Sequence, residues 1–188
     1  MKTKNKTNYQ EYVNINNDNN YEIINGELIM VPAPDFNHQT IQTNLGYRLI
    51  DFVKKNNLGM ILFPPIDVKL SDDTCVQSDI LFLSNERKNI ATKRGISGSP
   101  DLVIEIVSKY SQYRDNIEKK EIYQNFKIKE YWIVNPYMKS VEVLVLENDK
   151  YKLFSESFID EDNDINKVKS YVLKNFIIDL NEIFVDLI

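Results

Sequence analysis

The sequence predicts an α/β (α+β) fold in which a central mixed β-sheet is flanked by helices, in one domain over residues 1–188. Short apolar runs rich in β-branched residues recur between residues 21 and 154, each bounded by turn-forming residues, which is typical of strands. Two longer segments repeat apolar residues at helical spacing. The length of 188 residues, with 43% hydrophobic and 27% charged residues, is that of one globular domain.

The first predicted elements are a short helix and a β-hairpin. We expect the helix over residues 7–15 and an asparagine-rich loop over residues 14–20. Asn25 and Gly26 separate the strands predicted at 21–24 and 27–30, and this dipeptide tolerates the positive φ angles of a type I′ turn. A tight antiparallel hairpin is therefore expected.

A long helix is predicted from Phe36 to Asn57. Ile41, Leu45 and Leu49 recur at helical spacing, and Gly59 is suited to the end of the helix. One face of this helix is expected to pack on the sheet.

The rest of the chain alternates strands with a polar connection and two helices. We predict strands at 60–63 and 66–70, a strand that carries Asp79, a polar stretch at 85–99, a strand at 102–107, a helix at 111–127, strands at 131–134, 141–146 and 151–154, and a helix at 180–187. The predicted division is an N-terminal helix and loop (1–20), a core (21–155) and an acidic C-terminal segment with a short helix (156–188).

The net charge of −5 argues against a broad basic surface for nucleic acid. Residues 147–188 hold ten acids and five bases, so residues 1–146 hold eighteen of each. The acidity therefore belongs to the C-terminal end, whereas the middle of the chain is neutral and carries Lys109, Arg114, Lys119 and Lys120.

The single cysteine, Cys75, excludes an internal disulfide and any multi-cysteine zinc site. The basic N-terminus is followed by no apolar stretch of the kind found in signal peptides, and no apolar run approaches the roughly 20 residues that span a bilayer. We therefore expect a cytoplasmic protein without a membrane partner.

Two acids lie inside apolar runs. Asp79 is in the run 78–83 and Glu105 is in the run 102–107. A buried acid is costly unless it is paired, and two acids brought together by neighbouring strands would form an oxygen site for Mg²⁺, or for Mn²⁺. Strand alternation places Glu105 on the same face as Asp101 and Val103, and we expect the carboxylates of Asp79 and Glu105 within about 6 Å of each other.

A lysine near these acids is predicted from the helix that follows. Ile122 and Phe126 define its core-facing side, and three residues before Ile122 is Lys119. Lys120 falls on the opposite, polar side, so Lys119 is the lysine expected to point toward the acids.

Other interpretations of these residues remain open. Asp79 and Glu105 could each belong to a structural ion pair, and Lys119 could extend its ammonium into water. Asp101 is expected to cap the start of its strand or hold a turn rather than share a metal. His38, the only histidine, is expected to be solvated or to cap the long helix.

The ordered set of motifs resembles the bacterial Uma-two family of proposed restriction endonucleases, within the PD-(D/E)xK nuclease superfamily. The resemblance runs from about residue 8 to the end of the chain. It rests on the segments 21–28 and 100–108, on Pro34 with His38 four residues later, on Asp79, on Arg114-Asp115, Lys119 and Tyr123, and on the segment 130–134.

The resemblance implies a restriction-endonuclease-like core and a role for each site residue. Asp79 takes the place of the first metal-binding acid, and Glu105 takes the acid of the (D/E)-x-K element. Val107 stands where that element has lysine, and Lys119 on the following helix is implied as its replacement. Glu22 matches an additional acid near the site. Ser78 departs from the proline that many relatives have before the aspartate.

These observations predict a Mg²⁺-dependent endonuclease that hydrolyses phosphodiester bonds in DNA. Asp79 and Glu105 would bind the metal, Glu22 would support them, and Lys119 would orient water or stabilise charge. Two alternatives are a nuclease-fold interaction module without robust catalysis and a hydrolase of another phosphate ester. A homodimer would suit the cutting of both strands of a duplex.

Overall fold

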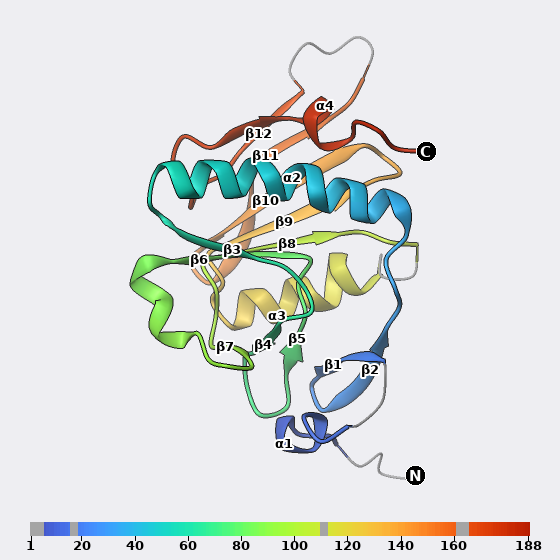
Figure 1. Ribbon diagram of the computed structural model, residues 1–188, viewed down its shortest axis with the longest axis vertical. Coiled ribbons are helices and arrows are strands. Elements are labelled where there is room, and N and C mark those ends of the chain that lie inside the picture. Colours follow the sequence, from blue (N-terminus) through green and yellow to red (C-terminus); the bar gives the residue numbers. More distant parts are fainter. Residues whose placement is uncertain (1–5, 16–18, 110–112, 161–165) are drawn as a thin grey trace.

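The computed structural model describes residues 6–15, 19–109, 113–160 and 166–188, and a six-stranded mixed sheet forms its centre (Figure 1). The strand order is β11-β10-β9-β8-β6-β3, in which β8 and β9 are parallel and the other neighbours are antiparallel. The strands are β3 (Gly59–Leu62), β6 (Ile80–Ser84), β8 (Leu102–Ile106), β9 (Glu130–Asn135), β10 (Ser140–Glu147) and β11 (Lys150–Phe158). The predicted mixed sheet is confirmed.

The two faces of this sheet are covered by different layers. On β8, Leu102, Ile104 and Ile106 belong to the apolar core beneath helix α2 (Phe36–Lys55). Val103 and Val107 belong to the opposite core, which helix α3 (Lys120–Asn125) covers. The predicted alternation of β8 is therefore correct. The four buried apolar side chains that α2 contributes are Ile41, Leu45, Leu49 and Val53.

A second sheet of five short strands adjoins the α3 side. Its order is β2-β1-β5-β4-β7, with β1 (Asn20–Ile24), β2 (Glu27–Val31), β4 (Asp67–Lys69), β5 (Cys75–Val76) and β7 (Gly95–Ser97). The hairpin of β1 and β2 is confirmed, since Asn25 and Gly26 have φ angles of 53° and 82°. The strands predicted on either side of Pro64-Pro65 belong to different sheets.

The helices differ in extent from the predictions. Helix α1 (Tyr9–Tyr12) is shorter than predicted, and its start is fixed by a capping box between Asn8 and Glu11. Helix α4 (Leu180–Ile183) ends four residues early. Within the predicted helix at 111–127, the structure has a π-helical segment, η2 (Arg114–Lys119), which α3 continues to Asn125. The polar stretch contains the 3₁₀ helix η1 (Asn85–Ile90) and β7. The predictions for residues 16–18 and 110–112 lie outside the described residues.

The C-terminal segment contributes two strands that the sequence did not predict, β12 (Lys167–Lys169) and β13 (Ile177–Asp179). Val168, Phe176 and Ile178 join the core on the α2 side of the sheet. Buried Glu130 holds this segment, because it accepts hydrogen bonds from Ser170 Oγ (3.1 Å) and Tyr171 N–H (2.9 Å). The division at residue 155 stays a prediction, although residues beyond it pack into the main core.

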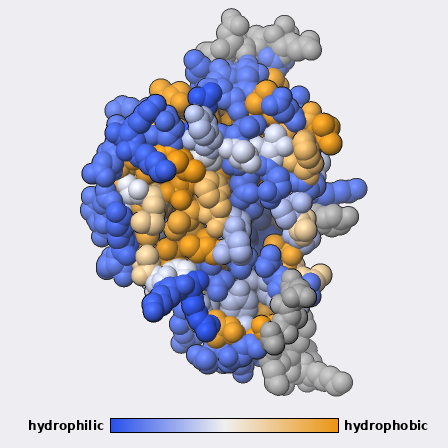
Figure 2. Space-filling model, viewed as in Figure 1, coloured by the Kyte–Doolittle hydropathy of each residue, from blue (hydrophilic) through white to orange (hydrophobic). Residues whose placement is uncertain are grey.

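Strand β3 forms one edge of the central sheet, and its four residues are all partly exposed. Figure 2 shows apolar side chains, in orange, gathered over this edge.

Within the described part of the chain, no helix has the length and apolarity needed to cross a membrane.

Asp101 binds the last residue of β6 and the lysine that precedes β9. Its side chain accepts the backbone N–H of Ser84 (3.0 Å) and pairs with Lys129 Nζ (2.7 Å). Burial acts to raise the pKa of Asp101, but the bonds to Lys129 and Ser84 outweigh it and hold the pKa below its ordinary value.

We predict that Asp101→Asn destabilises the protein by about 1–2 kcal/mol at pH 7. A lowered folded-state pKa gives stability that is present above the ordinary carboxyl pKa and is lost as the pH falls through the lowered value. The difference between wild type and variant in urea unfolding should therefore shrink below about pH 4. Asp149→Asn is the matched control, because Asp149 pairs with Lys127 while both are largely exposed, and it should cost almost nothing. Equal losses in the two variants would contradict this account.

Candidate active site

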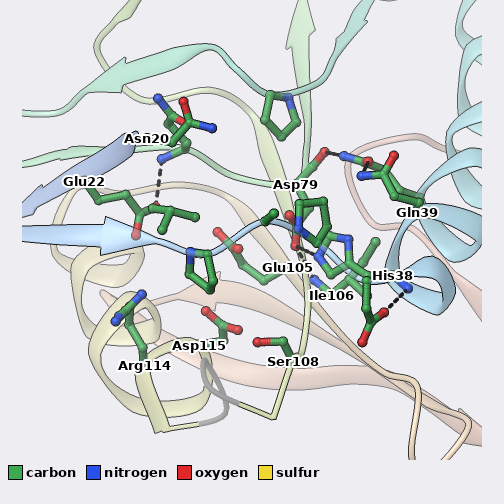
Figure 3. Close-up of a pocket in the computed structure, with 18 of the residues that line it drawn as sticks. Asn20, Glu22, His38, Gln39, Asp79, Glu105, Ile106, Ser108, Arg114 and Asp115 are labelled. Carbon is green, nitrogen blue, oxygen red and sulfur yellow. Dashed lines mark hydrogen bonds and ion pairs between the residues drawn. The ribbon is translucent and has the colours of Figure 1, made fainter. Parts of the chain in front are cut away.

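A pocket of about 390 Å³ opens where the two sheets meet the first turns of α2 and η2 (Figure 3). All four predicted site residues, Asp79, Glu105, Lys119 and Glu22, line it. They come from different parts of the chain: Glu22 from β1, Asp79 from the residue before β6, Glu105 from β8 and Lys119 from the end of η2. The antiparallel pairing of Ile80 with Ile104 brings the ends of β6 and β8 together at the pocket.

The Lys119 ammonium lies between two carboxylates. Its Nζ is 2.9 Å from Glu22 Oε1 and 3.0 Å from Glu105 Oε1. The Lys119 side chain is only 5% exposed, so it does not extend into water. Lys120, the next residue, is partly exposed, which confirms the predicted phase of the helix. Val107, in the position of the missing strand lysine, is buried in the apolar core.

The charges of this cluster are unbalanced. Burial opposes the charged form of Lys119, but Glu105, Glu22 and Asp115 raise its pKa well above the ordinary value. Burial also raises the pKa of Glu105 well above its ordinary value; Lys119 opposes this effect, and Asp79, Asp115 and Glu22 add to it. The causes differ: the neighbouring acids raise the pKa of Lys119 against its burial, whereas burial is the largest cause of the raised pKa of Glu105.

Glu105 is further held by a chain of hydroxyl groups. Tyr123 Oη donates to Glu105 Oε1 at 2.5 Å, and Ser78 Oγ lies 3.1 Å from the Tyr123 oxygen. Because the Tyr123 proton is directed at the carboxylate, Ser78 is the donor in the second bond. Ser78 therefore has a partner in the site.

Asp79 is oriented by two donors on one of its oxygens. Oδ2 accepts the backbone N–H of Ile106 (2.7 Å) and lies 3.1 Å from His38 Nε2. The Asp79 carbonyl also accepts a bond from Gln42 Nε2 (2.6 Å). The expectation that His38 is solvated or caps the helix is wrong: its side chain is 11% exposed and contacts Asp79, while Asp35 is the cap of α2.

Asp115 lies in the pocket, although the sequence predicted no role for it beyond its place in the Arg114-Asp115 motif. It is 2% exposed and lines the pocket one turn before Lys119. Helical spacing indicates a buried Asp115, because residues four apart share a helix face and Lys119 is predicted on the buried face.

Asp101 does not line the pocket. Cys75 is buried, and burial raises the pKa of its thiol, which leaves it unreactive.

The donor set fits a magnesium-type ion. Asp79 Oδ1 and Glu105 Oε2 make no hydrogen bond with any described residue, so one oxygen of each acid is available. No group of three histidine, cysteine or acidic side chains encloses a metal position in the described ranges. Mg²⁺ is commonly held by one or two carboxylates together with water and substrate phosphates, which is the arrangement these two oxygens allow.

Comparisons with known proteins give a family and a fold for this chain. The family model Uma2, described as "Putative restriction endonuclease", matches residues 7–168. The chain belongs to the Uma2 family. A crystal structure of "a putative nuclease belonging to DUF820" from Anabaena variabilis is similar, with a TM-score of 0.74 and 17% identity over 93% of this chain and 96% of that one. This likeness gives the Uma2 chain a nuclease-like fold. A search of curated proteins found no match.

We predict that Lys119→Met destabilises the metal-free protein by about 3–5 kcal/mol at pH 8, because it leaves buried acids without a cation. Glu105→Gln should cost about 1 kcal/mol or less, since it removes one charge from an acid-rich cluster. Thermal melts in EDTA at pH 8 and pH 5 measure both effects, and the Lys119→Met penalty should be smaller at pH 5 than at pH 8, because the raised pKa of Glu105 favours its neutral form as the pH falls.

Lys120→Met is the matched control and should stay within about 0.5 kcal/mol of wild type. If Lys119→Met is as stable as Lys120→Met at pH 8, the cluster does not depend on the Lys119 ammonium.

Proposed function

We propose that this protein is a Mg²⁺-dependent endonuclease that hydrolyses phosphodiester bonds in DNA. The observation that carries the proposal is the meeting of Asp79 and Glu105 in one pocket with Lys119, each acid having one oxygen available. Membership of a family described as "Putative restriction endonuclease" supports the choice of DNA as substrate.

The charge of the pocket favours a metal-dependent reaction. Among the described residues, five acids and three bases line it: Glu22, Asp35, Asp79, Glu105 and Asp115 against Lys109, Arg114 and Lys119. A phosphodiester would be repelled by this excess of negative charge. A divalent cation held by Asp79 and Glu105 would reverse the local sign.

Each residue has a task in the proposed reaction. When bound, the ion would polarise the phosphodiester and lower the pKa of a bound water. Lys119 would donate to the negative charge that develops on phosphate oxygens or would orient the attacking water. Glu22 keeps Lys119 in the pocket, and His38 with the Ile106 N–H keeps Asp79 turned so that Oδ1 remains available.

An interaction module without catalysis is the second candidate. The negative net charge and the absence of a strand lysine favour it, whereas the buried Lys119 beside Glu105 favours catalysis, because it supplies the missing cation. A hydrolase of another phosphate ester would use the same chemistry. Cleavage assays distinguish the endonuclease, the interaction module and the hydrolase of another phosphate ester.

We predict that Asp79→Asn and Glu105→Gln each lower DNA cleavage in Mg²⁺ by at least about 10²–10³-fold, because each removes a metal ligand. The assay follows plasmid nicking and cleavage of a labelled single-stranded DNA, with Mg²⁺, Mn²⁺ or EDTA. Glu142→Gln is the control, because Glu142 is an exposed acid on β10 outside the pocket, and it should cleave as wild type does.

Wild type that binds DNA but cleaves none with either metal would favour the interaction module. Hydrolysis of small phosphate esters alone would favour the third candidate. Light scattering with and without DNA would establish whether a dimer forms.

A further inference from the structure

The reactive side chains of the pocket are largely buried. The side chains of Glu105 and Lys119 are 3% and 5% exposed, and that of Asp79 is 16% exposed. The pocket volume of about 390 Å³ is near the lower end of the range for ligand pockets, about 300–1,000 Å³. Such a volume accepts a nucleotide-sized part of one strand. A base-paired duplex, which is wider than its own major groove of about 12 Å, is too large to enter it.

An exposed aromatic ring lies at the wall of this pocket. Tyr137 is 63% exposed and is in the turn between β9 and β10. Asn135 Oδ1 accepts the backbone N–H groups of Tyr137 (3.0 Å) and Met138 (3.1 Å), which fixes the turn. An exposed ring on a turn whose backbone is fixed offers a platform on which an unpaired base of any sequence can stack.

Among the described residues, two cations besides Lys119 line the pocket. Lys109 and Arg114 line the pocket, where Lys109 is exposed and Arg114 is partly exposed. Contacts of this kind bind backbone phosphates without reading sequence. Two cations beside an acidic pocket, in a chain of net charge −5, do not make the wide basic surface that a duplex would follow. They suffice for a short stretch of one strand.

From the depth of the acids, the exposed ring and the few cations, we infer that the preferred substrate is an unpaired DNA strand, with Tyr137 stacking on a base beside the cleaved phosphodiester. The inference rests on the proposed nuclease function and names the strand state of its substrate. In a duplex the bases stack on one another and offer no free face to Tyr137, so pairing should remove this contact.

The test uses one unstructured oligonucleotide of fixed sequence, labelled at its 5′ end, as a single strand and annealed to its complement. Cleavage in Mg²⁺ gives kcat and KM for each form, and fluorescence anisotropy in Ca²⁺ gives the affinity of the single strand. We expect cleavage of the single strand to be at least about 10-fold more efficient, and Tyr137→Ala to raise KM and weaken single-strand binding about 10-fold with kcat little changed. Tyr137→Phe should keep the wild-type values, because the ring is retained.

Tyr47→Ala is the matched control: Tyr47 is 64% exposed but lies on α2 outside this pocket, and its replacement should leave KM and binding unchanged. Efficient cleavage of the duplex that Tyr137→Ala does not alter would overturn the inference and leave the nuclease function intact. If neither form is cleaved, the proposed function fails, and anisotropy still decides the inference: single-strand binding that Tyr137→Ala does not weaken would overturn it.

Discussion

The ion pairs of Lys119 with Glu22 and Glu105 are the interaction on which the candidate site depends. They join β1 of the small sheet, β8 of the central sheet and the helix that covers both. One ammonium group therefore links β1, β8 and η2. Tyr123, one turn further along the same helix, adds a hydrogen bond to the same Glu105 oxygen.

The pocket keeps more acids together than folding alone would favour. Burial and the neighbouring acids raise the pKa of Glu105, although Lys119 opposes them. An apolar residue in place of Glu105 would avoid the cost of burying this charge. Local arrangements that reduce stability are commonly found at functional sites, where the retained charge serves binding or catalysis. The same excess of acids that lowers stability is what makes the pocket suited to a divalent cation.

Periodic local patterns predicted much of this structure. The Asn25-Gly26 turn predicted the hairpin, strand alternation predicted which face of β8 carries Glu105, and the helical phase selected Lys119 over Lys120. Long-range contacts were not predictable in this way. His38 reaches Asp79 only because α2 begins beside the start of β6, and Ser78 reaches Tyr123 only because α3 lies against the segment between β5 and β6. The strands β12 and β13 are three residues each, too short to give a periodic signal.

The central claim is that Asp79 and Glu105 together hold a divalent cation. The most direct measurement is anomalous X-ray scattering from crystals soaked in Mn²⁺, for wild type and for Glu105→Gln. The account predicts one anomalous peak in the wild-type pocket, about 2.0–2.6 Å from an oxygen of each acid, and its loss or marked weakening in the variant. A peak elsewhere, or a pocket peak that the variant retains unchanged, would contradict the claim.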